Sequence, residues 1–483
     1  MVITRFAPSP TGYFHAGSYR TALFSWIFAR QNKGKFILRI EDTDKERSKK
    51  EYEENIIESL KWLGLEYDEF FRQSDRTEIY KKYIHQMIAS GHAYVSNEEM
   101  RAVIPAHAGI QDQTSNSNAD TQTTRDSRLR GNDTKKSGVD NSSTPRRSSV
   151  IRFKNPNKKV IFNDTIRGQV EFDTTELGDF VIAKSEDEPV FHLVVVIDDH
   201  EMGITHIIRG EDHISNTPRQ ILIYEAIGAQ APQYAHIPLL LSADRSKLSK
   251  RKGAVPVSEY RAKGYLREAI VNYLALLGWH PSDDREVLST EEIIKEFSLE
   301  RVQKSGAIFD EEKLKWFNRQ YMVKLSDTDF TEHAIPFLPE WIVPKSDTFK
   351  NLIPILKDKI VTFAEITTML ATNGELAFVH QLSSYPKESL LWKKNPDAQA
   401  AHTHLTKVRE LISSLGESEF IAEGIKSSIW AYVEASGKGD VLWPLRMSLT
   451  GQDKSPDPFV SAALLGKNES LKRIGAALAK LKA

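Results

Sequence analysis

With 483 residues the chain is too long for a single hydrophobic core, and its length predicts two to four domains. Its 65 basic and 66 acidic side chains leave a net charge of −1. This balance neither indicates nor excludes a nucleic-acid partner, so such a partner has to be argued from local sequence. The absence of cysteine excludes disulfides and thiolate metal sites. Because no signal peptide and no apolar run near the ~20 residues of a membrane span are evident, we expect a cytoplasmic protein that does not enter a membrane.

The first forty residues follow the pattern of a strand, a turn, a helix and a second strand. Residues 2–6 and 36–40 are short apolar runs typical of buried strands, and the apolar residues between 22 and 30 recur with helical spacing. This order predicts a βαβ unit with a parallel sheet. The turn after the first strand then lies at the carboxyl end of the sheet, where open α/β sheets bind ligands.

Strand-like runs resume after residue 149, near positions 150, 159, 169 and 179. The run at 190–199, VFHLVVVIDD, is almost continuously apolar and rich in β-branched residues, and we predict it as a central buried strand. Another strand is predicted within 205–213 and a helix over 266–277. After about Tyr321 the pattern is mostly helical.

The segment from Gln111 to Ser149 differs from its surroundings. Its only apolar residues are Ala119, Leu129 and Val139, among many Ser, Thr, Asn, Asp, Gln and Arg. Such a segment cannot bury enough apolar surface to offset the entropy lost on ordering. We therefore interpret it as a disordered insertion.

The stretch APSPTGYFHAGS, residues 7–18, is suited to binding phosphate. Its prolines and glycines stiffen a loop before a predicted helix, and the exposed N–H groups and dipole at a helix N terminus favour an anion. His15 can donate a hydrogen bond to phosphate, and Gly17 leaves room for a base or ribose. A purely structural turn would have a similar composition.

A second candidate is SKLSKRKGA, residues 246–254, which carries four basic side chains. A mobile cationic loop can close on a triphosphate and neutralise the charge that develops as diphosphate leaves. A solvated basic turn would look the same in isolation.

Together the two motifs resemble the paired signatures of class I aminoacyl-tRNA synthetases, usually written HIGH and KMSKS. Further segments narrow the resemblance to bacterial glutamyl-tRNA synthetases: TRFAPSPTG, RTALF, LRIEDTD, GLEYDE, VVVIDDHEMGITHIIRGEDHISNTPRQ, KLSKRKGA and KLKWFN. They match that family in order and spacing, and the resemblance covers nearly the whole chain except the insertion.

The resemblance implies an α/β Rossmann-like catalytic domain with an inserted α+β subdomain, followed by an all-α C-terminal region. The catalytic domain is expected at 1–240, with an acceptor-stem-binding subdomain inserted at about 80–190 and the low-complexity insertion at about 104–149 inside it. A stem-contact domain with the KLSKR loop is expected at 241–322, and a helical anticodon-binding domain at 323–483. The family also implies a monomer.

The implied activity is that of a glutamate–tRNA ligase. Such an enzyme uses ATP with Mg²⁺ to convert glutamate to glutamyl-adenylate, and then transfers the glutamyl group to the 3′ end of tRNA(Glu). The sequence leaves open whether tRNA(Gln) is also charged. Because the substrate carboxylate is itself the nucleophile, catalysis rests on alignment and charge stabilisation.

Matching residue by residue implies a glutamate site and an ATP site. Arg5 and Arg209 match arginines that hold glutamate, since a guanidinium grips a carboxylate with two parallel bonds; an ion pair at a strand end is the alternative reading of each. Glu41 matches the residue that binds the substrate ammonium, with a surface carboxylate as the alternative. His15 and Lys250 match the catalytic, phosphate-contacting members of the two signatures. The other matches are Ala7, Ser9 and Phe191 for glutamate, and Pro8, Gly12, Gly17, Ser18, Lys247, Ser249 and Arg251 for ATP.

Two residues depart from the family pattern. Ser18 stands where the first signature has its second histidine, and it can still offer a hydroxyl or cap the helix. Phe191 stands where many members have tyrosine, so either a substrate contact is missing or Phe191 packs beside the site. These departures keep a catalytically impaired tRNA-binding or regulatory paralogue as the alternative function. Some members bind zinc through cysteines, which this chain lacks, so no zinc and no other protein-bound metal is expected.

The C-terminal region matches the family more loosely. Lys357 and Lys359 are candidate contacts to the tRNA anticodon loop, although a solvated helix face would look the same. Four tryptophans could stack on unpaired bases, as in many RNA-binding proteins, but a core position is the more common role: Trp341, Trp392, Trp430 and Trp443.

Overall fold

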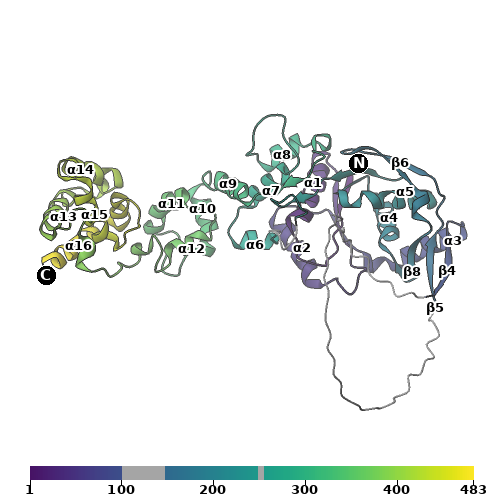
Figure 1. Cartoon of the computed structure of the whole chain (residues 1–483), viewed down its shortest axis with the longest axis horizontal. Helices are drawn as coiled ribbons and strands as arrows, with labels where there is room; N and C mark the ends of the chain where they lie inside the picture. Colours follow the sequence, from purple (N-terminus) through teal and green to yellow (C-terminus); the bar gives the residue numbers. More distant parts are fainter. Residues whose placement is uncertain (100–146, 249–254, 483) are drawn as a thin grey trace, which may run out of the picture.

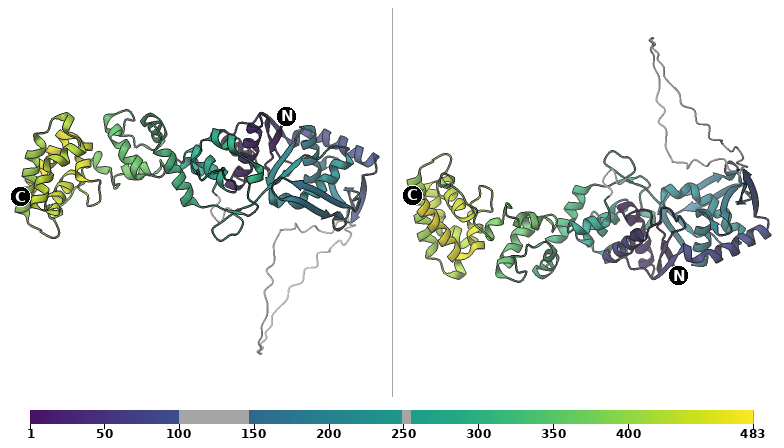
Figure 2. Two further views of the ribbon diagram at one scale, coloured as in Figure 1. Left: turned by 90° about the horizontal axis from the view of Figure 1, so that it is seen from above. Right: turned by 90° about the horizontal axis from the view of Figure 1, so that it is seen from below.

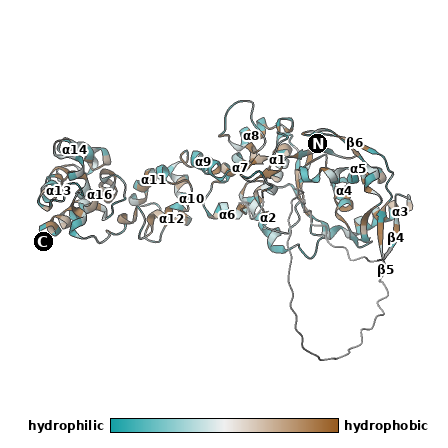
Figure 3. Ribbon diagram, in the orientation of Figure 1, coloured by the Kyte–Doolittle hydropathy of each residue, from teal (hydrophilic) through white to brown (hydrophobic). Residues whose placement is uncertain are grey.

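The computed structural model describes residues 1–99, 147–248 and 255–482 of the chain. The molecule is elongated, with the N terminus in an α/β body at one end and the C terminus in a helical bundle at the other (Figures 1 and 2). Most helices carry both hydrophobic and hydrophilic residues (Figure 3), as expected for elements with one buried and one solvated face. Within the described ranges, none of the helices combines the length and the apolar character needed to cross a bilayer.

Parallel strands form the centre of the α/β body. One sheet has the order β1–β2–β3, with β1 at Ile3–Phe6, β2 at Lys35–Ile40 and β3 at Glu69–Arg72. A second has the order β10–β11–β6–β7, with β10 at His206–Gly210, β11 at Gln233–Ile237, β6 at Lys159–Asp164 and β7 at Gly168–Asp173. β1 and β10 lie side by side, and Thr205 N donates to Ile3 O at 2.9 Å. The predicted βαβ unit is confirmed, with α1 (Ala16–Gln31) between β1 and β2.

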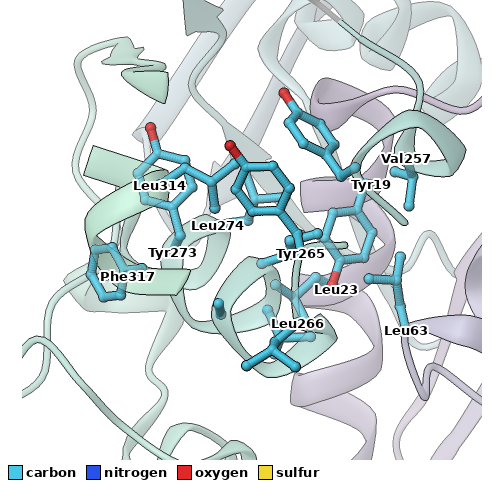
Figure 4. Packing of buried hydrophobic residues seen from close by; sticks show 14 of the residues in the cluster. Tyr19, Leu23, Leu63, Val257, Tyr265, Leu266, Tyr273, Leu274, Leu314 and Phe317 are labelled. Carbon is cyan, nitrogen blue, oxygen red and sulfur yellow. The ribbon is translucent and has the colours of Figure 1, made fainter. Parts of the chain in front are cut away.

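Helix α1 is buried between the strands and a group of later elements. Its side chains Tyr19 and Leu23 are fully buried and pack near Leu266 and Leu274 (Figure 4). These partners belong to the region α6 (Val257–Ala262), α7 (Arg267–Leu276), α8 (Thr290–Glu296), β13 (Ala307–Ile308) and α9 (Glu311–Met322), which begins after β12 (Leu240–Leu241). One apolar core therefore joins the first βαβ unit to the segment that follows the KLSKR motif.

An α+β subdomain lies between β3 and β10. It contains α3 (Thr77–Ala89) and an antiparallel sheet with the order β4–β5–β8–β9, at Ala93–Glu99, Arg147–Phe153, Phe180–Ser185 and Glu188–Pro189. Strand β5 begins three residues earlier than the sequence pattern predicts. The rest of the predicted insertion, 104–146, lies outside the described residues, and the domain boundaries stay predictions.

The prediction of a strand at 190–199 is wrong, because this segment forms helix α4 (Phe191–Glu201). Leu193 to Asp199 are all buried, and a helix surrounded by protein needs no polar face, so its sequence resembles that of a central strand. The burial of Asp198 and Asp199 explains why this segment is a helix and not a strand. One guanidinium, that of Arg39, lies 3.7 Å from Asp198 and 2.7 Å from Asp199, whereas neighbouring side chains of a strand point to opposite faces.

The C-terminal region is helical, as predicted. A first group comprises α10 (Asp327–Ala334), α11 (Asp347–Lys359) and α12 (Glu365–Leu370). A terminal bundle comprises α13 (Ala398–Ser413), α14 (Ala422–Ser436), α15 (Lys438–Thr450) and α16 (Pro458–Lys482). The four tryptophans considered above are partly buried; Trp341 stacks on His380 at 4.6 Å, and Trp392 lies 5.6 Å from Trp443 between ring centroids.

The turn after α6 joins the α/β body to the first helical group. Gly264 there has φ +74°, and its carbonyl accepts from Phe363 N at 3.3 Å. A Cβ on Gly264 would lie 2.6 Å from Phe363 Cβ and 3.0 Å from Phe363 N. The close backbone approach at this junction therefore requires glycine.

We predict that Gly264→Ala lowers the free energy of unfolding by about 2–4 kcal/mol, from a strained positive φ and overpacking. The matched control is Gly91→Ala, because Gly91 also has a positive φ (+76°) but a Cβ there would meet nothing within 4 Å. Urea unfolding monitored by circular dichroism measures both. Equal losses in the two variants would contradict the proposed contact.

Candidate active site

A cavity of about 560 Å³ opens at the carboxyl ends of β1, β10 and β11. It lies where the chain order reverses, since β2 follows β1 on one side and β10 lies on the other, and such switch points bind ligands in open α/β sheets. Most of the residues predicted for glutamate and ATP line it: Arg5, Ala7, Pro8, Ser9, His15, Gly17, Ser18, Glu41, Phe191, Arg209 and Lys247. Gly12 lines a smaller hollow of about 220 Å³ that shares Pro8, Ser9, His15 and Ser18 with the cavity.

The two signature segments meet at this cavity. His15 is the N-cap residue of α1, so Ser18 lies in the first turn and does not cap the helix as the sequence suggested. The backbone of His15 bridges to Pro256, and Val257 N donates to Phe14 O at 3.0 Å. On the other flank of the KLSKR motif, Leu248 N donates to Leu240 O at 2.9 Å. Ser249, Lys250 and Arg251 themselves lie outside the described residues.

A buried charge network lies beneath the part of the cavity that Arg5 and Glu41 line. Arg39, with no exposed surface, donates to Glu41 Oε1 at 3.1 Å and to Asp199 Oδ1 at 2.7 Å. The same Asp199 oxygen accepts from Arg5 Nε at 3.2 Å. Arg5 is thus both a cavity residue and the member of an ion pair, while Glu41 is buried and not a surface carboxylate.

The network shifts the pKa values of Glu41 and Asp199 in opposite directions. Burial raises the pKa of Glu41, against the attraction of Arg39 and Arg5. Burial also disfavours ionised Asp199, but Arg39 and Arg5 outweigh it and hold the pKa of that carboxyl below its usual value. Asp199 therefore carries the fixed negative charge, whereas the ionised form of Glu41 would be stabilised by a further cation in the cavity.

Asp198 extends the network to the inserted subdomain. Its carboxylate accepts hydrogen bonds from Gln73 at 3.0 Å, Arg76 at 2.7 Å and the Tyr80 hydroxyl at 2.9 Å. Two adjacent residues of α4 thus connect the cavity on one side with α3 on the other. The sequence contained a signal for them, since two acids at the end of a continuous apolar run have to be buried with cationic partners.

Arg209 is fixed by a relay that the sequence did not reveal. Its Nε donates to His236 Nε2 at 3.1 Å, and its Nη2 donates to Thr217 Oγ1 at 2.8 Å. Because His236 Nε2 accepts, its proton lies on Nδ1, which donates to Asp164 at 2.6 Å. Burial lowers the pKa of Arg209 to about 10, so it stays protonated at neutral pH. A lone histidine in YAHIP gave no sequence signal for this role.

Arg20 links the cavity to the segment after the KLSKR motif. It lines the cavity, donates to Leu277 O at 2.7 Å, and also donates to Pro238 O. Burial lowers its pKa to about 9, opposed by the charge of Glu211. Arg20 therefore fixes the end of α7 against the loop that follows β11.

Lys357 and Lys359, predicted to contact tRNA, lie in the last turn of α11, away from the cavity lining. Lys357 Nζ donates to Leu325 O and Asp327 Oδ1, both at 2.8 Å, and Lys359 pairs with Glu375 at 2.5 Å. Among residues 1–99, 147–248 and 255–482, no group of three or more His, Asp or Glu side chains could hold a metal ion.

Two family models match the chain in succession. Residues 1–316 match the catalytic domain of class I tRNA synthetases (E and Q), and residues 329–478 match an anticodon-binding domain. The glutamate–tRNA ligase of Aquifex aeolicus (strain VF5) is 43% identical, with 99% of each chain covered. This chain belongs to the glutamyl-tRNA synthetase family.

Other relatives agree with this assignment. The glutamate–tRNA ligase of Sulfurihydrogenibium sp. (strain YO3AOP1) is 43% identical over 93% of both chains. The crystal structure of a glutamate tRNA ligase from Elizabethkingia meningosepticum in complex with its amino acid has a TM-score of 0.80 at 33% identity, with 99% of both chains covered. The class I catalytic fold followed by an all-helical region, inferred from the sequence, is confirmed for this synthetase family member.

His192, next to Phe191 in α4, makes stability depend on pH. Its Nδ1 is buried without a hydrogen-bond partner within the described chain. Burial, together with the charges of Arg219 and Arg209 and a smaller effect of His213, lowers its pKa to about 4. The unfolded chain, with an ordinary histidine pKa near ~6.5, binds the proton more readily. Protonation therefore favours unfolding increasingly as the pH falls from about 6.5 to about 4.

We predict that between pH 7 and pH 5 the wild type loses about 2 kcal/mol more unfolding free energy than His192→Phe. Urea titrations at the two pH values measure this difference. His85→Phe is the control for the loss of a histidine, because the His85 side chain is exposed; it should not reproduce the effect of His192→Phe. Parallel curves for the wild type and His192→Phe would refute the assignment.

Proposed function

We propose that this protein ligates glutamate to tRNA through a glutamyl-adenylate formed from ATP. The observation that carries the proposal is the single cavity in which Arg5, Glu41, Arg209 and the His15 turn come together at the switch point of the sheet. Two guanidinium groups suit the two carboxylates of glutamate, and a carboxylate suits its ammonium. Full-length similarity to glutamate–tRNA ligases supports the same conclusion.

In this proposal Arg5 and Arg209 hold the amino acid by its carboxylates, and Glu41 holds the ammonium. The raised pKa of Glu41 means that its charge is incompletely balanced by the protein, so a substrate ammonium would complete the balance. Ala7, Ser9 and Phe191 shape the remaining wall. An amino acid of the same size with an uncharged side chain would leave one of the two arginines without the substrate carboxylate that it is proposed to bind, and such a loss strongly disfavours a substrate.

ATP would occupy the end of the cavity near α1. His15 and the first backbone N–H groups of the helix, at Gly17 and Ser18, are the groups best suited to bind an anion there. Pro8 and Gly12 line the adjoining hollow. Lys247 lines the cavity, and Ser249, Lys250 and Arg251 follow it in the chain. We propose that Mg²⁺ enters with the triphosphate, which commonly supplies its ligands in nucleotide sites.

The reaction needs no strong base. A carboxylate oxygen of glutamate attacks the α-phosphorus of ATP, an acyl–phosphate bond forms, and the bond to the β-phosphate breaks with release of diphosphate. A ribose hydroxyl at the 3′ end of tRNA then attacks the glutamyl carbonyl, forming an ester and releasing AMP. His15, Lys250 and the helix N terminus would stabilise the charge on the phosphates.

The helical region would contact the anticodon side of the tRNA. For Lys357 and Lys359 to do so, each would exchange its partner within the chain for phosphate or base. We propose a cytoplasmic monomer, with the KLSKR motif and the inserted subdomain at the acceptor end. No observation favours a catalytically impaired paralogue, since the described members of both predicted sets line the cavity or its adjoining hollow.

Aminoacylation of purified tRNA(Glu) and tRNA(Gln) transcripts with labelled glutamate and ATP tests the proposal. We expect charging of tRNA(Glu), and the second transcript decides whether tRNA(Gln) is also a substrate. Arg209→Lys should lower kcat/KM for glutamate about 100-fold, because lysine loses the paired bonds and the contacts to His236 and Thr217. Arg30→Lys, at a partly exposed pair with Asp68 outside the cavity, is the control. If neither transcript is charged, the proposed function is refuted.

Lys250→Ala should lower the turnover number about 100-fold or more while changing the Kd for tRNA little, because the cation acts on charge that develops in the transition state. Single-turnover charging and filter binding separate the two effects. Lys263→Ala is the matched control, since Lys263 is exposed and pairs with Glu259. Unchanged turnover in Lys250→Ala would rule out the assigned role.

A further inference from the structure

His213 lies in the amino-acid end of the cavity and has no role among the residues matched above. It belongs to a short 3-10 helix, Glu211–Asn216, that follows β10 directly. His213 lines the cavity, and its ring lies 5.9 Å from the ring of Phe191, centroid to centroid. Two residues already assigned to glutamate therefore lie next to His213. Phe191 lies against its ring, and Arg209, at the end of the preceding strand β10, acts on it through its positive charge.

The hydrogen bonds of His213 fix which ring nitrogen donates. The side-chain amide nitrogen of Asn216 lies 3.2 Å from Nδ1, and an amide N–H can only donate, so Nδ1 accepts. In the neutral ring the proton then lies on Nε2. The ring therefore offers an N–H donor from Nε2, while Nδ1 is occupied.

The neutral form is the one present at physiological pH. Burial first, and then the charge of Arg209, lower the pKa of His213 to about 4, against the attraction of Asp212. The backbone places it as well, because His213 O accepts from Thr217 Oγ1 at 3.2 Å and Thr217 Oγ1 accepts from Arg209 at 2.8 Å. One threonine hydroxyl thus ties the loop of His213 to the guanidinium of Arg209.

We propose that His213 is a further substrate-binding residue, whose Nε2–H donates to the glutamate carboxylate held by Arg209. Phe191 has no polar group to fill this role, and its ring supports the imidazole instead. The inference rests on the proposed function, since it needs glutamate in this cavity. A neutral donor adds a directed hydrogen bond without adding a third buried cation beside Arg5 and Arg209, which would repel both.

Three variants of the full-length protein separate donation from packing. His213→Phe keeps an aromatic ring against Phe191 but removes the donor. His213→Gln places an amide nitrogen near the position of Nε2, and His213→Asn places one near Nδ1. Steady-state aminoacylation at saturating ATP and tRNA gives the KM for glutamate, and thermal unfolding checks that each variant folds.

We expect His213→Phe and His213→Asn to raise the KM for glutamate about tenfold or more, the value of a hydrogen bond to a charged group. His213→Gln should stay within about threefold of the wild type, and the KM for ATP should change little in all three. A wild-type KM in His213→Phe, or an equal rise in the Gln and Asn variants, would overturn the proposal. If His213→Phe fails to fold, the Gln and Asn pair alone decides. The wild-type enzyme is assayed for tRNA charging in parallel. If it charges tRNA and the His213 variants show no effect, only the role of His213 is wrong; if it does not charge tRNA, the proposed function is wrong.

Discussion

The part of the cavity lined by Arg5 and Glu41 depends on the ion pairs of the buried Arg39 guanidinium. This guanidinium touches Glu41 and Asp199 directly, lies close to Asp198, and through Asp199 it shares a carboxylate with Arg5. An unpaired charge in such a place costs several kcal/mol, so the side chains of β1, β2 and α4 have to be placed together. The positions of the cavity-lining Arg5 and Glu41 are therefore a property of the core and not of a loop.

The network also explains why the fold tolerates so many charges near one point. Arg5 and Arg39 each face a carboxylate within hydrogen-bond distance, and the relay from Asp164 through His236 does the same for Arg209 with one neutral group between. Pairing of this kind contributes little net stability, because desolvation offsets the attraction. Its effect is geometric: the donors stay directed at the cavity before any substrate arrives, which lowers the cost of binding it.

Sequence reasoning found many residues of the cavity wall, but neither Arg20 and His213 in that wall nor the residues behind it. His15, Arg5, Glu41 and Arg209 lie in motifs that are continuous in sequence and specific in order, and they line one cavity. Their supports come from separate segments, such as Asp164 in β6 and Thr217 in α5 (Thr217–Ala226), and pair only through the tertiary fold. Local pattern also failed for α4, where a completely buried helix and a central strand share the same apolar composition. Side-chain direction, which places both aspartates around Arg39, separates the two.

The antiparallel pair β4–β5 has a consequence for how this chain accommodates added length. Glu99 pairs with Arg147 at the end of the ladder, so residues 100–146 enter and leave at two neighbouring backbone positions. Closing a loop of that length instead of a tight turn costs only about 2 kcal/mol, since the entropy grows with the logarithm of length. The backbone pairing of Ala93 to Glu99 with β5 offsets this cost. The residues that line the cavity do not belong to β4 or β5. The end of the β4–β5 ladder, at Glu99 and Arg147, is thus a natural point for joining a reporter or affinity module to the synthetase without disturbing the residues that line the cavity.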